Sequence, residues 1–309
     1  MEIEQELANI APPEEMLLSI GVFDGVHAGH RYLLEKLKQR AKERELLSGV
    51  VTFNPHPQSL LRPQNHLPRL SDLEERVKSI KSLGIDIVVV ISFTPKVSQL
   101  SARDFVSLLK KHLMMRGLMV GPDFVLGRGR EGNVDFLRSL GQEMGFSVET
   151  VPFFTIDGEV VSSPLIRQKL AEGDMRTVKK LIGHHFYLKG EVVTSDKRGR
   201  GLGFPTANLD VKAQQAIPCN GTYASITYVD GNQFPSATNI GTRPTFENGK
   251  KIMETHLVNY AGDLYNKTIK IEFVQRLRGE QRFDSSEELK AQIRKDIREI
   301  ETILAEDLR

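Results

Sequence analysis

Cysteine, tryptophan and long hydrophobic runs are scarce or absent: the 309 residues include one cysteine and no tryptophan. The single thiol, Cys219, excludes an intrachain disulfide and a metal site built from several cysteines, and it suits a reducing compartment. The longest apolar stretch, residues 85–93, is far shorter than the roughly 20 residues of a membrane-spanning helix and contains Asp86. We therefore predict a soluble cytoplasmic protein without a membrane partner.

An excess of one charge is also absent. The 42 lysines and arginines nearly balance the 40 aspartates and glutamates, which leaves a formal net charge of +2. Because this balance favours neither nucleic acid nor an anionic membrane as partner, any phosphate binding must come from a local site. Residues 1–15 are acidic and lack the basic and apolar regions of a secretory signal, so we expect them to form a loose leader.

The length is about twice that of a typical domain, and the hydrophobic periodicity changes once, so we predict two domains. In residues 16–182, short β-branched runs alternate with helical patterns, which predicts a parallel, Rossmann-like α/β sheet with ligands beyond its carboxyl edge. In residues 183–309, short alternating segments separated by Gly, Asp and Asn predict a small antiparallel β-barrel. A helical stripe after a capping box at Ser285 and Glu288 predicts a C-terminal helix on the barrel.

The stretch GVFDGVHAGH, residues 21–30, lies where an apolar run gives way to a helical pattern. Gly25 can take a positive φ, and Gly29 lets a ligand approach the backbone where the helix begins. His27 and His30 would then lie at the positive end of the helix and donate hydrogen bonds to phosphoryl oxygens as charge develops. Two histidines at this spacing are more often surface residues, but the strand, turn and helix around them favour a phosphate site.

This stretch resembles the HxGH signature of the nucleotidyltransferases, and FDGVHxGH is similar to the adenylyltransferase half of the prokaryotic bifunctional riboflavin kinase/FMN adenylyltransferases. The resemblance continues in matching order through TFNPHP, GPDFVLG, SSPLIR, GFPTAN, NIGTRPTF, ETHL and LRGEQRFD. It implies a nucleotidyltransferase domain followed by a riboflavin kinase barrel. It also implies riboflavin, FMN and ATP as substrates and Mg²⁺ as cofactor.

In the first domain, the resemblance implies that His27, His30 and Arg167 are catalytic, with the Arg167 guanidinium on the ATP phosphates. By the residues alone, TFNPHP is equally well a rigid turn. SSPLIR opens a helix whether or not it binds ATP, with Ser163 suited to the N-cap and Pro164 to the first helical position. The nucleotide-binding positions implied by the resemblance are Gly21, Phe23, Asp24, Gly29, Asn54, His56, Ser162 and Ser163. The flavin-binding positions in this domain are Asp123 and Phe124.

Three details of the first domain depart from the family or compete with it. Pro164 stands where the family has a hydroxylated residue, and proline offers neither a hydroxyl nor a backbone N–H, so a slower adenylyl step is expected. Leu126 replaces the usual aromatic. A GxGxxG pattern at residues 127–132 comes late in the sheet rather than after its first strand, so we do not predict an NAD site.

The second domain contains no GxxxxGK[ST] pattern, which excludes a P-loop kinase. Thr206 and Asn208 are two apart on an extended segment and share a face, and their oxygens suit Mg²⁺ bridged to ATP phosphates. By the residues alone, the basic, glycine-rich segment before them is an ordinary loop between strands. The resemblance assigns the metal role to this pair. The nucleotide-binding positions that it implies here are Gly190, Lys197, Arg200, Thr206 and Asn208.

In KIMETHLV, Glu254 and His256 share one face of a predicted strand, and Met253 and Leu257 take the other. A carboxylate beside a polar pocket can accept the proton of an attacking hydroxyl, although a surface glutamate on a strand is unremarkable. By resemblance, Glu254 is the base that activates the ribityl hydroxyl of riboflavin. The flavin-binding positions implied in LRGEQRF are Arg278, Glu280 and Phe283.

The sequence therefore predicts an enzyme that phosphorylates riboflavin to FMN and adenylylates FMN to FAD. Two alternatives stay open. In one, Pro164 has silenced adenylylation and the chain is a riboflavin kinase. In the other, the chain is a non-catalytic, flavin-binding regulatory protein. Clustered aromatics on a basic strand face would favour RNA as its partner, and the sequence shows none.

Overall fold

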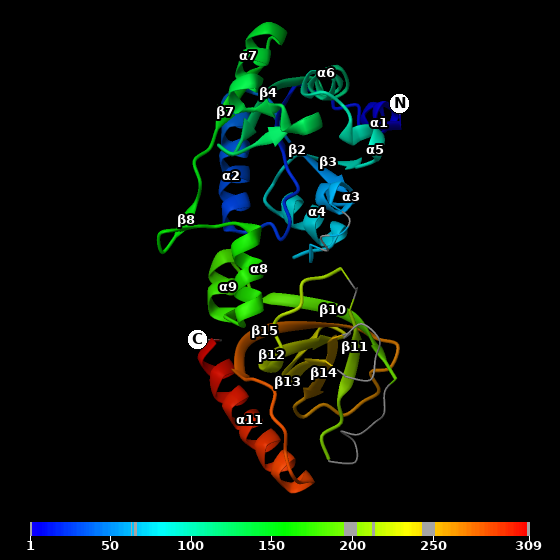
Figure 1. The fold of residues 1–309 in the computed structure, drawn as a ribbon, viewed down its shortest axis with the longest axis vertical. Helices are drawn as coiled ribbons and strands as arrows, with labels where there is room; N and C mark the ends of the chain where they lie inside the picture. The colour runs from blue at the N-terminus through cyan, green and yellow to red at the C-terminus, as the bar shows by residue number, and fades with distance from the viewer. Residues whose placement is uncertain are drawn as a thin grey trace. The chain divides into compact units, whose positions relative to one another are not determined.

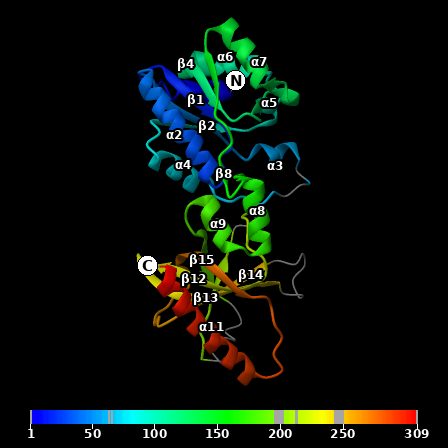
Figure 2. The ribbon, with the colours of Figure 1, turned by 90° about the vertical axis from the view of Figure 1, so that its left-hand side faces the viewer.

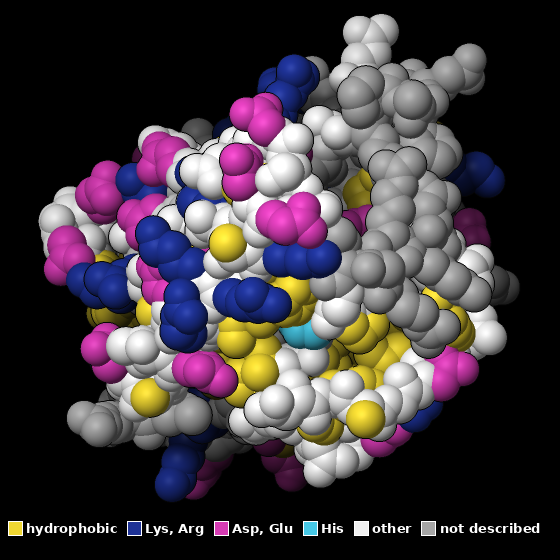
Figure 3. All heavy atoms as spheres, turned by 90° about the horizontal axis from the view of Figure 1, so that it is seen from below, with side chains coloured by type: hydrophobic (Ala, Val, Ile, Leu, Met, Phe, Trp, Pro, Cys, Tyr) yellow, Lys and Arg dark blue, Asp and Glu magenta, His cyan; other side chains and the backbone are white. Residues whose placement is uncertain are grey.

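A computed structural model describes residues 2–62, 64, 67–194, 203–211, 214–242 and 251–307. The chain divides into two compact units, Met1–Ser163 and Pro164–Arg309 (Figure 1). No helix among the described residues is long and apolar enough to span a membrane. On the face shown in Figure 3, basic side chains are interspersed with acidic ones, in keeping with the balanced composition.

The first unit is built on a parallel sheet, as predicted. Its strands are β1 (Met16–Ile20), β2 (Leu47–Asn54), β3 (Ile87–Ser92), β4 (Met115–Val120) and β7 (Ser147–Thr150). They lie in the order β3-β2-β1-β4-β7, and each neighbouring pair runs parallel. From β1 the chain adds β2 and β3 on one side of the sheet, and then β4 and β7 on the other side. The strand order thus reverses between β1 and β4, and such a sheet binds ligands in the crevice beyond the carboxyl ends of these two strands.

Helices cover both faces of this sheet (Figure 2). Leu17 and Leu18 of β1 are neighbours in the chain and belong to two different buried clusters, since successive strand residues point to opposite faces. The helices on the Leu17 face are α2 (Ala28–Glu43) and α4 (Leu73–Ser82). Those on the Leu18 face include α6 (Ala102–Leu113) and α7 (Val134–Met144). The short elements are α3 (Pro57–Leu61), α5 (Pro95–Ser98), β5 (Val125–Leu126), η1 (Arg128–Arg130), β6 (Gly132–Asn133), β8 (Thr155–Ile156) and β9 (Glu159–Val160).

The expectation of a loose leader is wrong for the first residues of the chain. They form helix α1 (Glu2–Ala8), which buries Ile3 and Leu7 in the same cluster as α6. These two residues are four apart and so lie on one helix face. The Glu6 carboxylate also accepts a hydrogen bond of 3.0 Å from the Ser92 amide at the end of β3. The leader is therefore part of the first core.

The second unit contains a closed antiparallel barrel, also as predicted. Its strands are β10 (Phe186–Val193), β11 (Ala207–Asp210), β12 (Gly221–Val229), β13 (Asn232–Thr242), β14 (Lys251–Leu257) and β15 (Thr268–Arg278). They close in the order β10-β11-β14-β13-β12-β15. The turn between β12 and β13 is Asp230 and Gly231, with φ of 49° and 83°, the positive values that a two-residue hairpin turn requires.

The predicted C-terminal helix is α11 (Ser286–Asp307), which runs along the outside of the barrel (Figure 2). Its Ile300 and Leu304 pack on Ala224 and Ile226 of β12. The Ser285 hydroxyl accepts a hydrogen bond of 3.2 Å from the Glu288 amide, so the predicted cap is present. The helix thereby shields one apolar outer surface of the barrel.

The barrel interior is unusually polar, which the strand pattern did not predict. Hydroxyl side chains that are completely buried fill its middle and bond to one another, with Thr238 donating to Thr255 at 2.9 Å and lying 2.7 Å from the Ser225 oxygen. The hydroxyl residues are Ser225, Thr227, Ser236, Thr238 and Thr255. Because each hydroxyl can both donate and accept, the group satisfies itself without water or charge. It ties β12, β13 and β14 together.

Residues 164–182, which the sequence analysis placed in the first domain, lie in the second compact unit. The next helix is α8 (Ser163–Glu172). Its Leu170 carbonyl accepts a hydrogen bond of 3.0 Å from the Cys219 amide. Helix α9 (Met175–Ile182) is strongly amphipathic and contacts β10 and β15. The apolar face of α9 needs a partner, and the barrel supplies it, so the division of the chain comes before these helices.

A fragment that begins at Pro164 is therefore expected to be more stable than one that begins at Gly183. The shorter fragment loses the buried side chains of α9, each worth about 1.5–3 kcal/mol when fully buried. These are Met175, Val178, Leu181 and Ile182. Urea unfolding followed by circular dichroism measures the difference, and both fragments should convert riboflavin to FMN while folded. Equal midpoints would show that α9 does not stabilise the barrel.

Candidate active sites

The first unit has a pocket of ≈ 510 Å³ at its switch point. It lies between the end of β1 and the start of α2, and its far wall comes from residues 121–124, 151–154 and 160–163. The residues predicted from the sequence that line it are Gly21, Phe23, His27, Gly29, His30, Asp123, Phe124, Ser162 and Ser163. The structure therefore brings together most of the positions proposed for the nucleotide and flavin.

The two histidine rings stack face to face in this pocket. Their centroids are 3.7 Å apart, and His27 is only 4% exposed. His27 is the N-cap of α2, and its Nδ1 accepts a hydrogen bond of 3.3 Å from the His30 amide. Since Nδ1 accepts, the proton of a neutral His27 ring belongs on Nε2. The cap thus fixes both the orientation and the tautomer of this side chain.

His30 is held in its neutral form. Burial, together with the neighbouring charges of His27 and Arg76, lowers the pKa of His30 well below its usual value. Its Nδ1 is buried and has no hydrogen-bond partner among the described residues. A neutral imidazole carries one N–H, so His30 can donate one hydrogen bond to a phosphoryl oxygen.

The backbone of the turn is unusual, as the glycine pattern predicted. Gly25 has a φ of 79°, and a side chain there would meet Leu70 at 3.0 Å. Phe23 and Val26 also take positive φ values of 54° and 38°. At Gly29, a side chain would lie 3.0 Å from the Val161 carbonyl oxygen and 3.3 Å from the His27 ring. A larger residue at 29 would therefore displace the ring that caps α2.

In the barrel, cross-strand register places Glu254 between two asparagines. It lies directly opposite Asn208 on β11 and Asn239 on β13, and opposed residues project from the same side of a sheet. Met253 and Leu257 are buried, whereas Glu254 and His256 are half-buried, so the predicted alternation of β14 is confirmed. Glu254 is therefore on the outer side of the barrel wall, beside the Asn208 amide.

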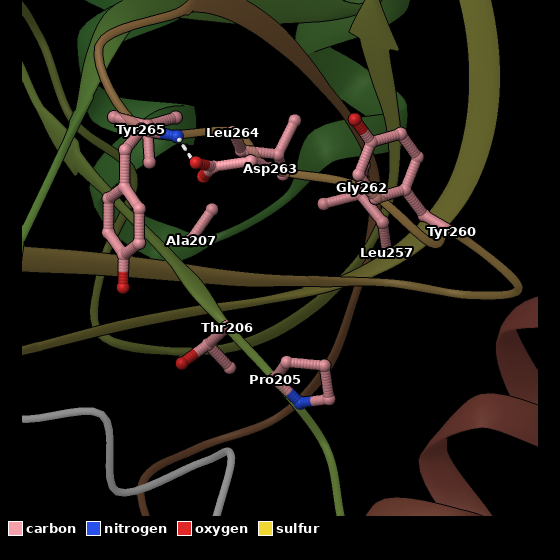
Figure 4. A pocket seen from close by; sticks show the side chains of 10 residues that line it. Pro205, Thr206, Ala207, Leu257, Tyr260, Gly262, Asp263, Leu264 and Tyr265 are labelled. Carbon is pink, nitrogen blue, oxygen red and sulfur yellow. Dashed lines mark hydrogen bonds between the residues drawn. The ribbon is translucent and has the colours of Figure 1, made fainter.

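A second pocket, of ≈ 550 Å³, opens at one end of the barrel (Figure 4). Pro205 and Thr206 lie on one side of it, and the segment from Tyr260 to Tyr265 lies on the other. That segment is fixed by a hydrogen bond of 3.0 Å from the Tyr265 amide to the Asp263 carboxylate. The aromatic rings of Tyr260 and Tyr265 and the predicted metal-binding residue Thr206 therefore line the same pocket.

Comparisons with known proteins cover both units. The FAD synthetase family model matches residues 9–165, and the riboflavin kinase family model matches residues 182–304. The bifunctional riboflavin kinase/FMN adenylyltransferase of Escherichia coli K12 is 40% identical over 288 residues, which is 93% of this chain and 92% of that protein. The chain belongs to the bifunctional riboflavin kinase/FMN adenylyltransferase family.

Other members and one solved structure agree along the whole length. The bifunctional riboflavin kinase/FMN adenylyltransferase of Pseudomonas fluorescens is 38% identical, with 96% of both chains covered. A crystal structure described as a macrolide-efflux protein from Streptococcus pneumoniae superposes with a TM-score of 0.87 at 25% identity and also covers 96% of both chains. As a bifunctional riboflavin kinase/FMN adenylyltransferase, the chain is a transferase.

Several positions predicted from this family do not line the pocket of the first unit. The Asp24 carboxylate is buried and accepts hydrogen bonds from the Leu70 and Ser71 amides at 3.0–3.2 Å, so it fixes a neighbouring loop. The His56 ring caps α3 by accepting from the Gln58 amide at 3.1 Å. The others are Asn54, at the end of β2, and Arg167, on α8. Their proposed ligand contacts remain predictions.

Some predicted positions of the kinase half are held by protein contacts. The Arg278 guanidinium forms an ion pair of 2.8 Å with the buried Asp296 of α11 and lies over the Phe283 ring. The Glu280 carboxylate accepts a hydrogen bond of 2.9 Å from the side-chain Nδ2 of Asn220. Gly190 lies within β10. Lys197 and Arg200 lie outside the described residues.

The sequence analysis missed two walls. In the first unit these are residues 151–154 and 160–161, where Phe153 is 50% exposed and Val160 is 41% exposed at the pocket. In the barrel it is the segment 260–265. Both carry an aromatic residue three positions after the end of a strand, Phe153 after β7 and Tyr260 after β14, which was the available signal. Apolar side chains left exposed at a pocket suit the flat face of a bound ring.

Proposed function

We propose that this chain makes FAD from riboflavin in two steps. The barrel transfers a phosphoryl group from ATP to riboflavin and gives FMN, and the α/β unit transfers AMP from a second ATP to FMN and releases pyrophosphate. The observation that carries the proposal is the stacked pair His27 and His30, held at the N-terminus of α2 in a pocket at the sheet's switch point. The two family models support the assignment of the adenylyl step to the first unit and of the kinase step to the barrel unit.

In the adenylyl step, the FMN phosphate attacks the α-phosphorus of ATP and pyrophosphate leaves. His27 donates from Nε2 and His30 donates from its neutral ring to oxygens on which charge builds, next to the positive end of α2. Ser162 and Ser163 contribute hydroxyls from the same pocket, and Arg167 follows one helical turn after Ser163 on α8. The exposed Phe153 suits the adenine ring. Positioning and charge stabilisation suffice, with no covalent enzyme intermediate.

The flavin of FMN is proposed to lie on the opposite side of that pocket, against Asp123 and Phe124. These residues follow β4, the strand across the switch point from the β1 end that leads to the histidines. Two substrates would then meet from the two sides of the crevice. This arrangement brings the FMN phosphate to the α-phosphorus without a large movement of either strand.

In the kinase step, the ribityl hydroxyl attacks the terminal phosphorus of ATP, Glu254 accepts the proton of that hydroxyl, and ADP leaves. Thr206 and Asn208 would hold Mg²⁺, and their hydroxyl and amide oxygens fit its preference for hard ligands, with phosphate oxygens and water completing the set. An ion held there would supply positive charge next to the ATP phosphates. Asn208 lies opposite Glu254 on the neighbouring strand, which supports a metal ligand next to the base. Tyr260 and Tyr265 suit the adenine ring in the adjoining pocket.

The remaining parts of the proposal concern surroundings and partners. Small molecules are the proposed partners, and nucleic acid is not among them because the formal charges of the sequence nearly balance. A cytoplasmic location is proposed because a chain with one cysteine suits a reducing compartment.

Product analysis tests the function directly. Purified protein is incubated with riboflavin, ATP and Mg²⁺, and the flavins are separated by chromatography over time. We expect FMN to appear first and FAD to follow. Accumulation of FMN alone, with no FAD from supplied FMN, would favour the riboflavin kinase alternative. Flavin binding without any conversion would favour the regulatory alternative.

Pro164→Thr is expected to raise the rate of FAD formation from FMN and to leave riboflavin phosphorylation unchanged. Threonine restores a backbone N–H and a hydroxyl in the first turn of α8, next to Ser163. One hydrogen bond contributes a net of about 0.5–1.5 kcal/mol, so an increase of up to about tenfold is expected. Pro164→Ala is the matched control, because it restores only the N–H. Equal rates in the two variants would show that the hydroxyl is not used.

A further inference from the structure

The turn that carries the two histidines is held from behind by a buried cation that the proposed chemistry does not use. Arg76, in the first turns of α4, is only 6% exposed. Its Nη1 donates a hydrogen bond of 2.7 Å to the Val22 carbonyl, and its Nη2 donates one of 3.1 Å to the Phe53 carbonyl. One guanidinium therefore spans two segments that are separate in the sequence.

These two carbonyls mark the carboxyl ends of adjacent strands. Val22 follows β1 by two residues, and Phe53 is the last residue but one of β2. The Val22 carbonyl also accepts a hydrogen bond of 3.0 Å from the Thr52 hydroxyl, so both of its lone pairs are used. The chain is thus pinned immediately before Phe23, the first residue of the turn with a positive φ.

The loop before α4 holds the rest of the same turn. The Ser71 hydroxyl accepts a hydrogen bond of 3.0 Å from the Gly25 amide, and the Asp24 carboxylate accepts from the Leu70 and Ser71 amides. Positive φ values at side-chain-bearing residues are unfavourable and persist only where the surroundings fix them. Residues 70–76 therefore set the backbone shape that presents His27 at the N-cap.

Arg76 also contributes a charge at this position. Its terminal nitrogens bond to neutral carbonyls, and its interaction with His30 helps to keep that ring neutral. The charged groups near His30 include His27 on the same turn, Arg76 from α4 and, across the pocket, Asp123. The buried Asp24 carboxylate of the same turn interacts with the Arg76 charge. A buried positive charge behind the histidines favours an anionic ligand in front of them.

We infer that Arg76 is a positioning residue for adenylyl transfer, which clamps the histidine turn to the ends of β1 and β2 and keeps a positive charge behind it. The inference rests on the proposed function of this pocket. Arg76 acts through the turn and through His30, and it contacts neither substrate.

The test compares Arg76→Met with Arg103→Met in the full chain. Arg103 is a matched control, since it is a helix arginine of the same unit that is 51% exposed and paired with Glu143. In Arg76→Met we expect kcat for FAD formation from FMN to fall about 10- to 100-fold, because misplacement of catalytic groups has effects of this size. KM for ATP should change less than about threefold, and FMN formation by the same protein should be unchanged. Arg103→Met should match the wild type.

The pH profile separates positioning from general damage. Removal of a positive neighbour raises the pKa of His30, so the acid limb of FAD formation should move to higher pH in Arg76→Met and stay in place in Arg103→Met. Damage to the fold alone would lower the rate equally at every pH. An Arg76→Met enzyme with the wild-type rate and profile would overturn the inference.

If Arg76→Met does not fold, Arg76→Lys tests the inference in its place. Lysine keeps the charge but has a single nitrogen in place of the fork that spans two carbonyls, so a lower rate with an unmoved acid limb is expected. A wild-type rate in Arg76→Lys would then overturn the clamp. The wild type is assayed first: if it makes no FAD from FMN, the proposed function fails, whatever the variants do.

Discussion

His30→Ala is expected to lower the rate of FAD formation from FMN by about 10²- to 10³-fold, the usual cost of losing one donor that acts in the transition state. Such a donor strengthens its hydrogen bond as charge moves onto the phosphoryl oxygens, so binding of ATP should fall much less than turnover. The ring is buried, neutral and stacked on His27, so it is already oriented before the substrate arrives. The riboflavin-to-FMN step should be unaffected.

The measurement is FAD formation from supplied FMN with pyrophosphatase present, which removes the product that could drive reversal. His112→Ala is the control, because His112 lies in the last turn of α6 in the same unit and is not among the residues that line the pocket. His27→Ala should act like His30→Ala, with an added loss of stability because His27 is the cap of α2. Wild-type rates in both histidine variants would show that residues 21–30 form only a turn and take no part in catalysis.

Glu254→Gln is expected to lower FMN formation by about 10²- to 10⁴-fold, the range typical of general-base catalysis. Glutamine keeps the size of the side chain and can still pair with Asn208 and Asn239 on the neighbouring strands, but it cannot accept the proton of the ribityl hydroxyl. Riboflavin and ATP should therefore bind nearly as well as before. FAD formation from supplied FMN should survive.

Glu299→Gln removes one carboxylate from the exposed side of α11 and serves as the control for Glu254→Gln. A Glu254→Gln enzyme that phosphorylates riboflavin at the wild-type rate would show that Glu254 is not the base.

Asn208→Ala is expected to raise the ATP and Mg²⁺ concentrations needed for FMN formation, because it removes a proposed Mg²⁺ ligand.

Local sequence patterns were sufficient for the parts of the molecule that depend on neighbouring residues. The β-branched runs gave buried parallel strands, and the alternation of Met253 to Leu257 gave a strand with one buried face. The Gly, Asp and Asn between the alternating segments marked turns such as that at Asp230 and Gly231, because few residues adopt positive φ values. The histidine stretch was also recognisable, since its cap and its glycines lie within ten residues.

The pattern was insufficient where a segment depends on a distant partner. Residues 1–15 gave no sign that Ile3 and Leu7 would find a place beside α6. The change of periodicity near residue 183 marked the start of the barrel strands. The sequence analysis therefore placed α9 in the first domain, whereas in the structure α9 packs on β10 and β15. Amphipathic periodicity shows that a helix has an apolar face, but not which core covers it.

The sequence by itself determined the two kinds of fold, the order of the two halves and the histidine turn, because strand alternation, helix periodicity, caps and turn chemistry act over a few residues. Only the tertiary structure decided which walls complete the pockets, that α8 and α9 join the barrel unit, and that Arg76 holds the carbonyls of Val22 and Phe53. Those contacts join residues far apart in the chain, and they exist only once the strands have been brought side by side.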